Sequence, residues 1–352
     1  MGRSEILEEG KIRMSRGSAF TLGLVTLDYK ETRKRLLERS LTVATTIYLL
    51  LYSKKRCSAR CAFCTQTSSK LTDFSITDIQ YPAFPIEIVA ERIAEAYSEG
   101  IIKNVCSQTI CMPNHFEMIR YAAEEIRKRS SVAITVCTTP APKKSLLKLK
   151  PLNLARFTIS MDCATPEVFS KIKGEKAKGP FRWESHIQGL KDAVEVFGKF
   201  KVGTHLMIGL GETEAEALSF IQQLFDIGIA SAIGPLLPVV GTGLENYKQP
   251  PIESYRKIQL ARYLIYQKKV RVEDMKFNKK GILVDFGVPK QELIKLIEAG
   301  TPFLSICTGC GGLKGACNRP FVADTPNLIY NFPRDITADE LAQIKRQVQM
   351  YF

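Results

Sequence analysis

The residues that decide the fold read ATTIYLLLYSKKRCSARCAFC, at positions 44–64. The first ten form an apolar run that predicts a buried strand. Directly after it come Cys57, Cys61 and Cys64, in a C-x3-C-x2-C spacing. Thiolates are the ligands of iron–sulfur clusters, and three of them leave one iron of a 4Fe-4S cluster open to a further ligand. A zinc knuckle or buried free thiols is the alternative, although zinc usually takes four protein ligands.

Outward from this stretch, short apolar runs alternate with longer amphipathic ones. The expected strands are 44–53, 101–107, 132–138, 156–161, 202–208 and 230–239, and the expected helices are 86–98, 115–129, 144–150, 183–197 and 214–225. Such alternation predicts βαβ crossovers, a parallel sheet and an α/β fold. Six units favour a partial (β/α)6 TIM-type barrel over a complete eightfold one. The site of such a barrel lies after the C-terminal ends of the strands, where Cys57 falls.

We expect three parts in the chain. Residues 1–42 are an N-terminal cap, residues 43–245 the partial barrel, and residues 246–352 a C-terminal extension that carries a second metal site. In the extension the pattern changes, with helices expected at 254–268 and 290–299 and a short strand at 282–284.

The second metal site is predicted from Cys307, Cys310 and Cys317, a C-x2-C-x6-C motif in a glycine-rich stretch. We favour an auxiliary 4Fe-4S cluster, because zinc sites normally supply all four ligands, but zinc stays the rival. Candidates for a fourth ligand are Ser305, Arg319 and Cys111.

Composition limits the class of protein. The chain has 352 residues, is 45% hydrophobic and carries a formal net charge of +14. No apolar stretch approaches the roughly 18 residues that a membrane span needs, and the first residues lack the apolar segment of a secretory signal. We therefore expect a cytoplasmic protein without membrane contact, whose ten cysteines serve metal binding or catalysis rather than disulfides. The basic residues are scattered, which fits a solvated surface first, an acidic protein partner second and nucleic acid last.

The first motif resembles that of the radical S-adenosylmethionine (radical SAM) superfamily, which places C-x3-C-x-aromatic-C after the first strand of a partial barrel. The resemblance implies that S-adenosylmethionine chelates the open iron. One electron from the cluster then cleaves it to a 5′-deoxyadenosyl radical, which abstracts hydrogen from the substrate. It also implies that Phe63 lies near the adenine.

Other family positions are matched less closely. The Gly-Gly-Glu usual after the second strand is absent, which leaves Gln108 as a candidate for the methionine amino group. Ser160 and Asp162 match the polar ribose position at the end of the fourth strand. Gly209 and Gly211 loosely match the glycine pattern of the fifth strand, although an ordinary strand-to-helix turn explains them as well.

The C-terminal segments 317–321 (CNRPF) and 329–333 (IYNFP) are similar to archaeal proteins related to biotin synthase that act in a two-protein lipoyl synthase. That resemblance implies sulfur insertion at C6 or C8 of an octanoyl chain on a carrier lysine, with the auxiliary cluster as sulfur donor. The implied partners are an acidic lipoyl carrier domain or a glycine-cleavage H-type protein, a second radical SAM subunit, and an electron donor such as ferredoxin. The chain departs from bacterial lipoyl synthases, in which the auxiliary cysteines precede the radical motif.

Two alternatives stay open. The first keeps the radical chemistry but changes the product, as in a biotin synthase-like reaction or a methylation. The second is a zinc-stabilised, basic RNA-binding protein without catalysis. We expect the remaining cysteines and His205 to be part of the core.

Overall fold

The computed structural model describes residues 8–25, 45–66, 82–304, 328–332 and 335–348. Its elements, in chain order, are β1 (Lys11–Met14), α1 (Arg16–Thr21), β2 (Thr46–Leu51), β3 (Ala83–Pro85), α4 (Ile86–Ser98), β4 (Asn104–Gln108), α5 (His115–Arg127), β5 (Ala133–Thr138), α6 (Lys143–Leu147), β6 (Arg156–Ile159), α7 (Pro166–Ile172), α8 (Trp183–Phe197), β7 (Val202–Ile208), α9 (Glu214–Asp226), β8 (Ile229–Pro235), α10 (Ile252–Tyr266), β9 (Lys276–Phe277), β10 (Leu283–Asp285), α11 (Lys290–Ala299) and α12 (Ala338–Val348).

One sheet organises the molecule, with strand order β3-β1-β2-β4-β5-β6-β7-β8. The pairings from β2 to β8 are all parallel, whereas β1 pairs antiparallel with both β2 and β3. The six parallel strands are those expected from the sequence. They confirm the α/β class and the partial barrel of six strand–helix units, and because their pairings are parallel the six strands end at the same edge.

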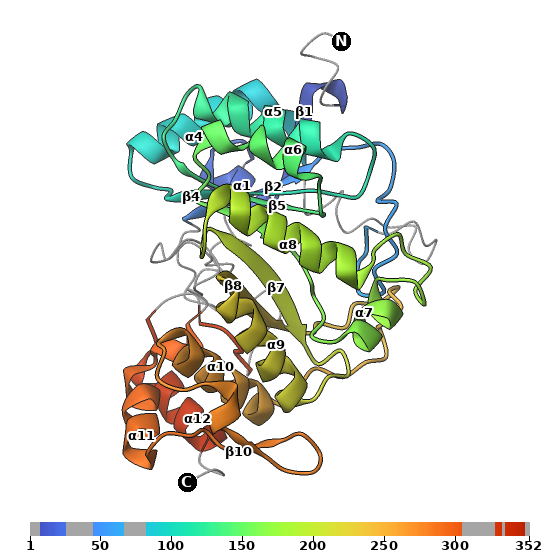
Figure 1. Cartoon of the computed structure of the whole chain (residues 1–352). Coiled ribbons are helices and arrows are strands. Elements are labelled where there is room, and N and C mark those ends of the chain that lie inside the picture. The colour runs from blue at the N-terminus through green and yellow to red at the C-terminus, as the bar shows by residue number, and fades with distance from the viewer. Residues whose placement is uncertain (1–7, 26–44, 67–81, 305–327, 333–334, 349–352) are drawn as a thin grey trace.

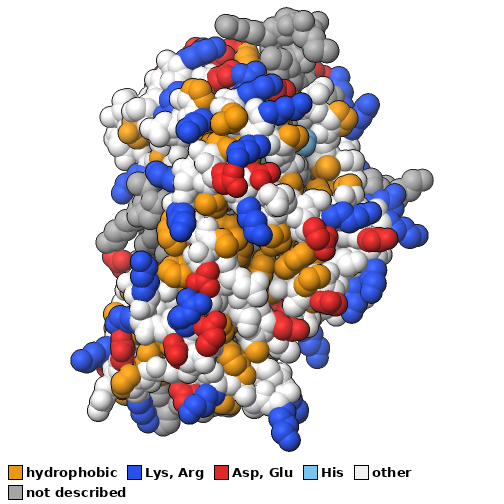
Figure 2. Space-filling model, in the orientation of Figure 1, with side chains coloured by type: hydrophobic (Ala, Val, Ile, Leu, Met, Phe, Trp, Pro, Cys, Tyr) orange, Lys and Arg blue, Asp and Glu red, His pale blue; other side chains and the backbone are white. Residues whose placement is uncertain are grey.

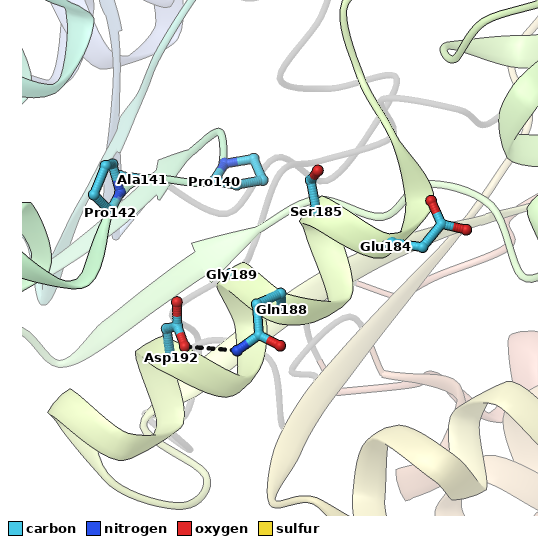
Figure 3. Close-up of a pocket in the computed structure, with 8 residues that line it drawn as sticks. All are labelled: Pro140, Ala141, Pro142, Glu184, Ser185, Gln188, Gly189 and Asp192. Carbon is cyan, nitrogen blue, oxygen red and sulfur yellow. Dashed lines mark hydrogen bonds between the residues drawn. The ribbon is translucent and has the colours of Figure 1, made fainter.

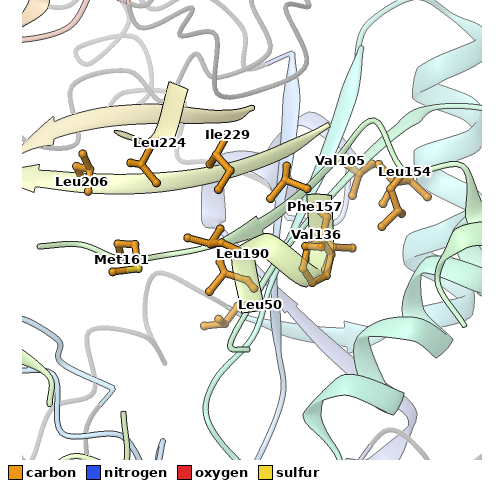
Figure 4. Close-up of a cluster of buried hydrophobic side chains, with 14 of the residues drawn as sticks. Leu50, Val105, Val136, Leu154, Phe157, Met161, Leu190, Leu206, Leu224 and Ile229 are labelled. Atoms are coloured by element: carbon orange, nitrogen blue, oxygen red, sulfur yellow. The ribbon is translucent and has the colours of Figure 1, made fainter. Parts of the chain in front are cut away.

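The two faces of the sheet differ in character. Val105, Val136 and Phe157 lie on the face that the helices cover, and the ring of Phe157 stacks on Phe197 of α8 with centroids 5.0 Å apart. Figure 4 shows this apolar cluster, in which Leu190 of α8 meets the strands. The opposite face carries Cys106, Gln108, Thr135 and other polar side chains, as expected for the interior of a barrel whose site lies at its open end.

The helices α10, α11 and α12 gather at one end of the molecule, beside α9 and away from α4, α5 and α6 (Figure 1). A buried ion pair joins this region to the barrel, with the ammonium of Lys257 on α10 lying 2.7 Å from the carboxylate of Glu214 on α9. The boundaries at residues 42 and 245 stay predictions. Ser305, Cys307, Cys310, Cys317 and Arg319 lie outside the described residues.

Among the described residues, no helix has both the length and the apolar character needed to cross a membrane.

Candidate functional site

A loop at residues 57–66 follows β2 and carries the first cysteine motif. The backbone N–H of Cys57 donates to the carbonyl of Gln66 at 2.9 Å, which closes the loop on itself. A second bond anchors the loop from outside, because the N–H of Ala62 donates to the carbonyl of Ile172, at the end of α7, at 2.7 Å. The three thiols are therefore presented by a tethered loop at the C-terminal edge of the sheet.

Two sulfurs of the motif accept backbone hydrogen bonds. The N–H of Cys111 lies 3.1 Å from Cys57 Sγ, and the N–H of Gln66 lies 3.4 Å from Cys64 Sγ. Cys111 is in turn fixed by Ser58, whose N–H and hydroxyl both donate to its carbonyl at 2.8 Å. Amide donors to cluster sulfurs are one of the features that tune an iron–sulfur site. Cys111, expected only as a core residue or a remote ligand, lies beside the first motif.

Burial sets the protonation of the free thiols. It raises the pKa of Cys64 to about 11 and also raises the pKa values of Cys57 and Cys61. The three thiolates act electrostatically on one another, so they become stable only with a positive group among them. A 4Fe-4S cluster supplies such a group, and the donor set fits it. In the described ranges, no three His, Cys, Asp or Glu side chains come together as ligands of a single metal ion; cluster thiolates instead bind separate irons.

A row of polar side chains crosses the neighbouring strands at the same edge. Gln108 at the end of β4 is the register partner of Cys137 on β5. The sulfur of Cys137 lies 3.6 Å from the hydroxyl oxygen of Ser160, which lies 3.0 Å from Nδ1 of His205 on β7. The structure thus brings the predicted Gln108 and Ser160 into one row. It adds Cys137 and His205, which sequence reasoning assigned to the core.

Asp162, three residues after the end of β6, adopts a left-handed conformation with φ of 62°. Its carboxylate is not directed freely into the mouth, because Lys173 Nζ lies 2.6 Å from Oδ2. The same ammonium donates to the carbonyl of Ser160 at 2.8 Å. The predicted ribose-binding residue is therefore half of a buried ion pair.

The loop after β7 contains both predicted glycines, with φ of 104° at Gly209 and 121° at Gly211, values that favour glycine. The side chain of Glu212 folds back on this loop and accepts hydrogen bonds from the N–H groups of Gly209 and Leu210 at 2.7 and 3.1 Å. Burial raises the pKa of Glu212. The carboxylate fixes the loop, a role that the sequence analysis did not find.

Phe63, predicted to lie near an adenine, is half-buried and packs against the core. The loop after β8 also reaches this motif, since a Cβ on Gly243 would lie 3.3 Å from the Cβ of Ala62. Loops after β2, β4, β6 and β8 therefore meet around the three cysteines.

A separate open cavity of about 480 Å³ lies between the loop after β5 and the first turns of α8. Figure 3 shows Pro140 and Pro142 facing Ser185 and Gln188, whose amide donates to Asp192 at 2.8 Å. None of the predicted site residues lines this cavity.

Comparison with known proteins bears on this arrangement. Residues 51–224 match the family model described as the radical SAM superfamily. No curated protein matches the chain. Among solved structures, the FeFe-hydrogenase maturase HydG matches with a TM-score of 0.50 and 16% identity over 72% of this chain, which spans 57% of that protein's length.

Two further structures are similar. HydG from Carboxydothermus hydrogenoformans matches with a TM-score of 0.49 and 15% identity, covering 95% of this chain and 85% of that one. Methylornithine synthase (PylB) matches with a TM-score of 0.49 and 12% identity, covering 72% and 73%. The likeness to the first HydG structure, at 16% identity, indicates a shared fold alone. The family match, the six-stranded parallel sheet and the cysteine loop at its C-terminal edge together establish that the chain contains a radical SAM superfamily domain, over residues 51–224.

Proposed function

We propose that this enzyme uses S-adenosylmethionine radical chemistry to insert sulfur into an octanoyl group carried on a protein lysine. The observation that carries the proposal is the pair of cysteine motifs in one chain, Cys57–Cys61–Cys64 at the barrel mouth and Cys307–Cys310–Cys317 in the extension. A radical enzyme needs one cluster, and a second cluster offers a source of sulfide.

The residues at the mouth have distinct tasks in this proposal. Cys57, Cys61 and Cys64 hold the first cluster, which when bound supplies the electron that cleaves S-adenosylmethionine to a hydrogen-abstracting radical. Gln108 and Ser160 supply hydrogen-bonding groups in the polar row at the C-terminal edge of the sheet. The glycine loop fixed by Glu212 lets backbone approach a flat ring closely.

The described residues on either side of the second motif lie close to the barrel mouth. Leu304 and Phe332 form a β-bridge, so the chain on both sides of the second motif meets at one place. The hydroxyl of Tyr330 donates to the carbonyl of Pro250 at 2.6 Å. Pro250 also contacts the glycine loop, because a Cβ on Gly209 would lie 3.0 Å from Cδ of Pro250. Tyr330 is therefore connected to the glycine loop at the barrel mouth through Pro250.

The charge of the chain suits the proposed carrier. A formal net charge of +14 attracts an acidic lipoyl carrier domain or H-type protein over long range. Figure 2 shows lysine and arginine side chains spread over one whole face with acidic ones among them, which favours general attraction over a single basic patch. A second radical SAM subunit and a ferredoxin-type electron donor complete the proposed system.

Iron and acid-labile sulfide per chain, measured after anaerobic purification, test the proposal. We expect about eight irons in the wild type and about four in a Cys307→Ala/Cys310→Ala/Cys317→Ala variant. Octanoyl-lysine carriers are then assayed for sulfur-containing product. We expect the auxiliary cluster to lose sulfide in proportion to the product formed. Four irons in both proteins, with one zinc only in the wild type, would contradict sulfur insertion.

A second candidate is a reaction on a small polar molecule, such as a biotin synthase-like reaction or a methylation. The polar row formed by Gln108, Ser160 and His205 favours it, because such groups hold a polar substrate better than an alkyl chain. Methylation predicts an auxiliary cluster that stays intact through many turnovers, whereas sulfur insertion predicts its loss.

A further inference from the structure

A buried lysine lies beside the first cysteine motif. Lys173 is 4% exposed, and its ammonium bonds the Asp162 carboxylate at 2.6 Å and the Ser160 carbonyl at 2.8 Å. It directly follows Ile172, whose carbonyl accepts the hydrogen bond from Ala62, the neighbour of Cys61. The backbone therefore fixes this side chain next to the cysteine loop.

Two aromatic rings also lie beside the ammonium. Lys173 Nζ lies 5.4 Å from the ring centroid of Phe169 and 5.0 Å from that of Phe181. Charges act over longer distances where water is excluded and the effective dielectric constant is low. The charge of Lys173 is thus weakly screened from the cysteine loop.

The ion pair of Lys173 and Asp162 places one cation and one carboxylate beside the cysteine loop, because Ile172, the neighbour of Lys173, is hydrogen-bonded to Ala62 of that loop. Burial opposes the charge on Lys173, but the adjacent Asp162 carboxylate raises its pKa, so the ammonium stays charged. Buried ion pairs seldom increase stability over apolar residues of similar size, so stability alone gives little reason for a lysine here.

We propose that Lys173 is a positioning residue that holds Asp162 and raises the reduction potential of the cluster bound by Cys57, Cys61 and Cys64. The physical cause is charge: reduction adds an electron to the cluster, and a nearby buried cation stabilises the more negative state. The negative charge of Asp162 lowers the reduction potential of the cluster. The inference rests on the proposed first cluster and concerns how readily it accepts its electron.

The test is a redox titration of the full chain, without S-adenosylmethionine, followed by electron paramagnetic resonance. The first cluster's signal is identified by its change when S-adenosylmethionine is added in a separate sample. Lys173→Met keeps the length of the side chain but removes the charge, and we expect a shift to more negative potential. Asp162→Asn removes the opposing charge, and we expect a shift to more positive potential. The double variant should lie between the two.

Lys257→Met is the matched control, because Lys257 is also buried and ion-paired, to Glu214 in the packing of α9 against α10. We expect it to lower stability without moving the potential. If Lys173→Met does not fold, the test rests on Asp162→Asn, whose cluster should show a more positive reduction potential than the wild type.

Iron and sulfide contents separate the two ideas under test. Wild-type protein without a cluster would overturn the proposed function itself. Clusters at wild-type content whose potential is unchanged in the Lys173 and Asp162 variants, or shifts in the same direction in both, would overturn only this inference.

Discussion

His186 is a buried histidine on α8 that is kept neutral by its surroundings. Burial first, and the charge of Lys173 second, lower its pKa from 6.5 to about 3. Its ring makes edge contacts with Phe169 and Phe181, at centroid distances of 5.0 and 5.1 Å, and its Nδ1 lies 3.1 Å from the carbonyl of Arg182. That distance implies that the proton is on Nδ1, which donates to the carbonyl.

The lowered pKa of His186 predicts a loss of stability in acid. Between pH 6.5 and about 3 the unfolded chain takes up a proton that the folded chain does not. The contribution of His186 is therefore fully present above pH 6.5 and falls on acidification, with a slope that approaches about 1.4 kcal/mol per pH unit. Urea unfolding at a series of pH values measures it.

His186→Asn isolates this contribution, because its amide can still donate to Arg182 but does not titrate. We expect the variant to be less stable at pH 7, through lost ring packing, and to show a flatter decline towards pH 4 than the wild type. Parallel declines in the two proteins would show that His186 is not the source.

At the level of residues, the sequence predicted the part of the site that is local. The spacing of Cys57, Cys61 and Cys64 carries its own chemical meaning, and the structure places them in one loop at the predicted edge. Lys173 and His205 were not found, because their roles depend on contacts with Asp162 and Ser160, which only the fold creates. A lysine eleven residues after an aspartate has no local signature.

At the level of elements, long periodic segments were predicted closely. The expected helices 86–98, 183–197 and 290–299 agree with α4, α8 and α11 to the residue. Of the missed elements, β1, β3, α1, β9 and α7 have four, three, six, two and seven residues, too few to show a hydrophobic period. The helix α12 was also missed, although its 11 residues are long enough to show one. The segment β1 is a strand because it pairs with β2. The sequence of its four residues does not indicate that pairing.

The helix α9 begins with a complete capping box, which gives a testable local contribution. The hydroxyl of Thr213 accepts from the N–H of Glu216 at 3.2 Å, and the Glu216 carboxylate accepts from the N–H of Thr213 at 2.7 Å. We expect Thr213→Ala to lower the free energy of unfolding by about 1 kcal/mol, measured in urea. Thr213→Ser retains the hydroxyl and should stay close to the wild type; equal losses in both would mean that the methyl group, not the cap, matters.

At the level of the whole molecule, a buried arginine on α10 holds the last described segments of the chain to that helix. Arg256 of α10 is 1% exposed and donates to the carbonyls of Ile329 and Tyr330 and to the side chain of Gln347 on α12. Its guanidinium lies 5.3 and 5.4 Å from the ring centroids of Phe303 and Phe332. One side chain thus contacts the described residues on both sides of the second cysteine motif.

Arg256→Met should therefore loosen the C-terminal segments more than the barrel. The variant fills similar space but leaves buried carbonyls without their donor, and hydrogen bonds from charged groups contribute about 1.5–3 kcal/mol each. We expect the free energy of unfolding to fall by at least about 3 kcal/mol, with faster limited proteolysis between residues 328 and 348 than within residues 82–250.

Arg262→Met is the matched control on the same helix, because Arg262 donates to the carbonyl of Ser231 on β8 at 2.7 Å. It should destabilise the chain without selective cleavage near the C-terminus. The same cleavage pattern in both variants would show that the two regions unfold as one unit and that Arg256 is no special link between them.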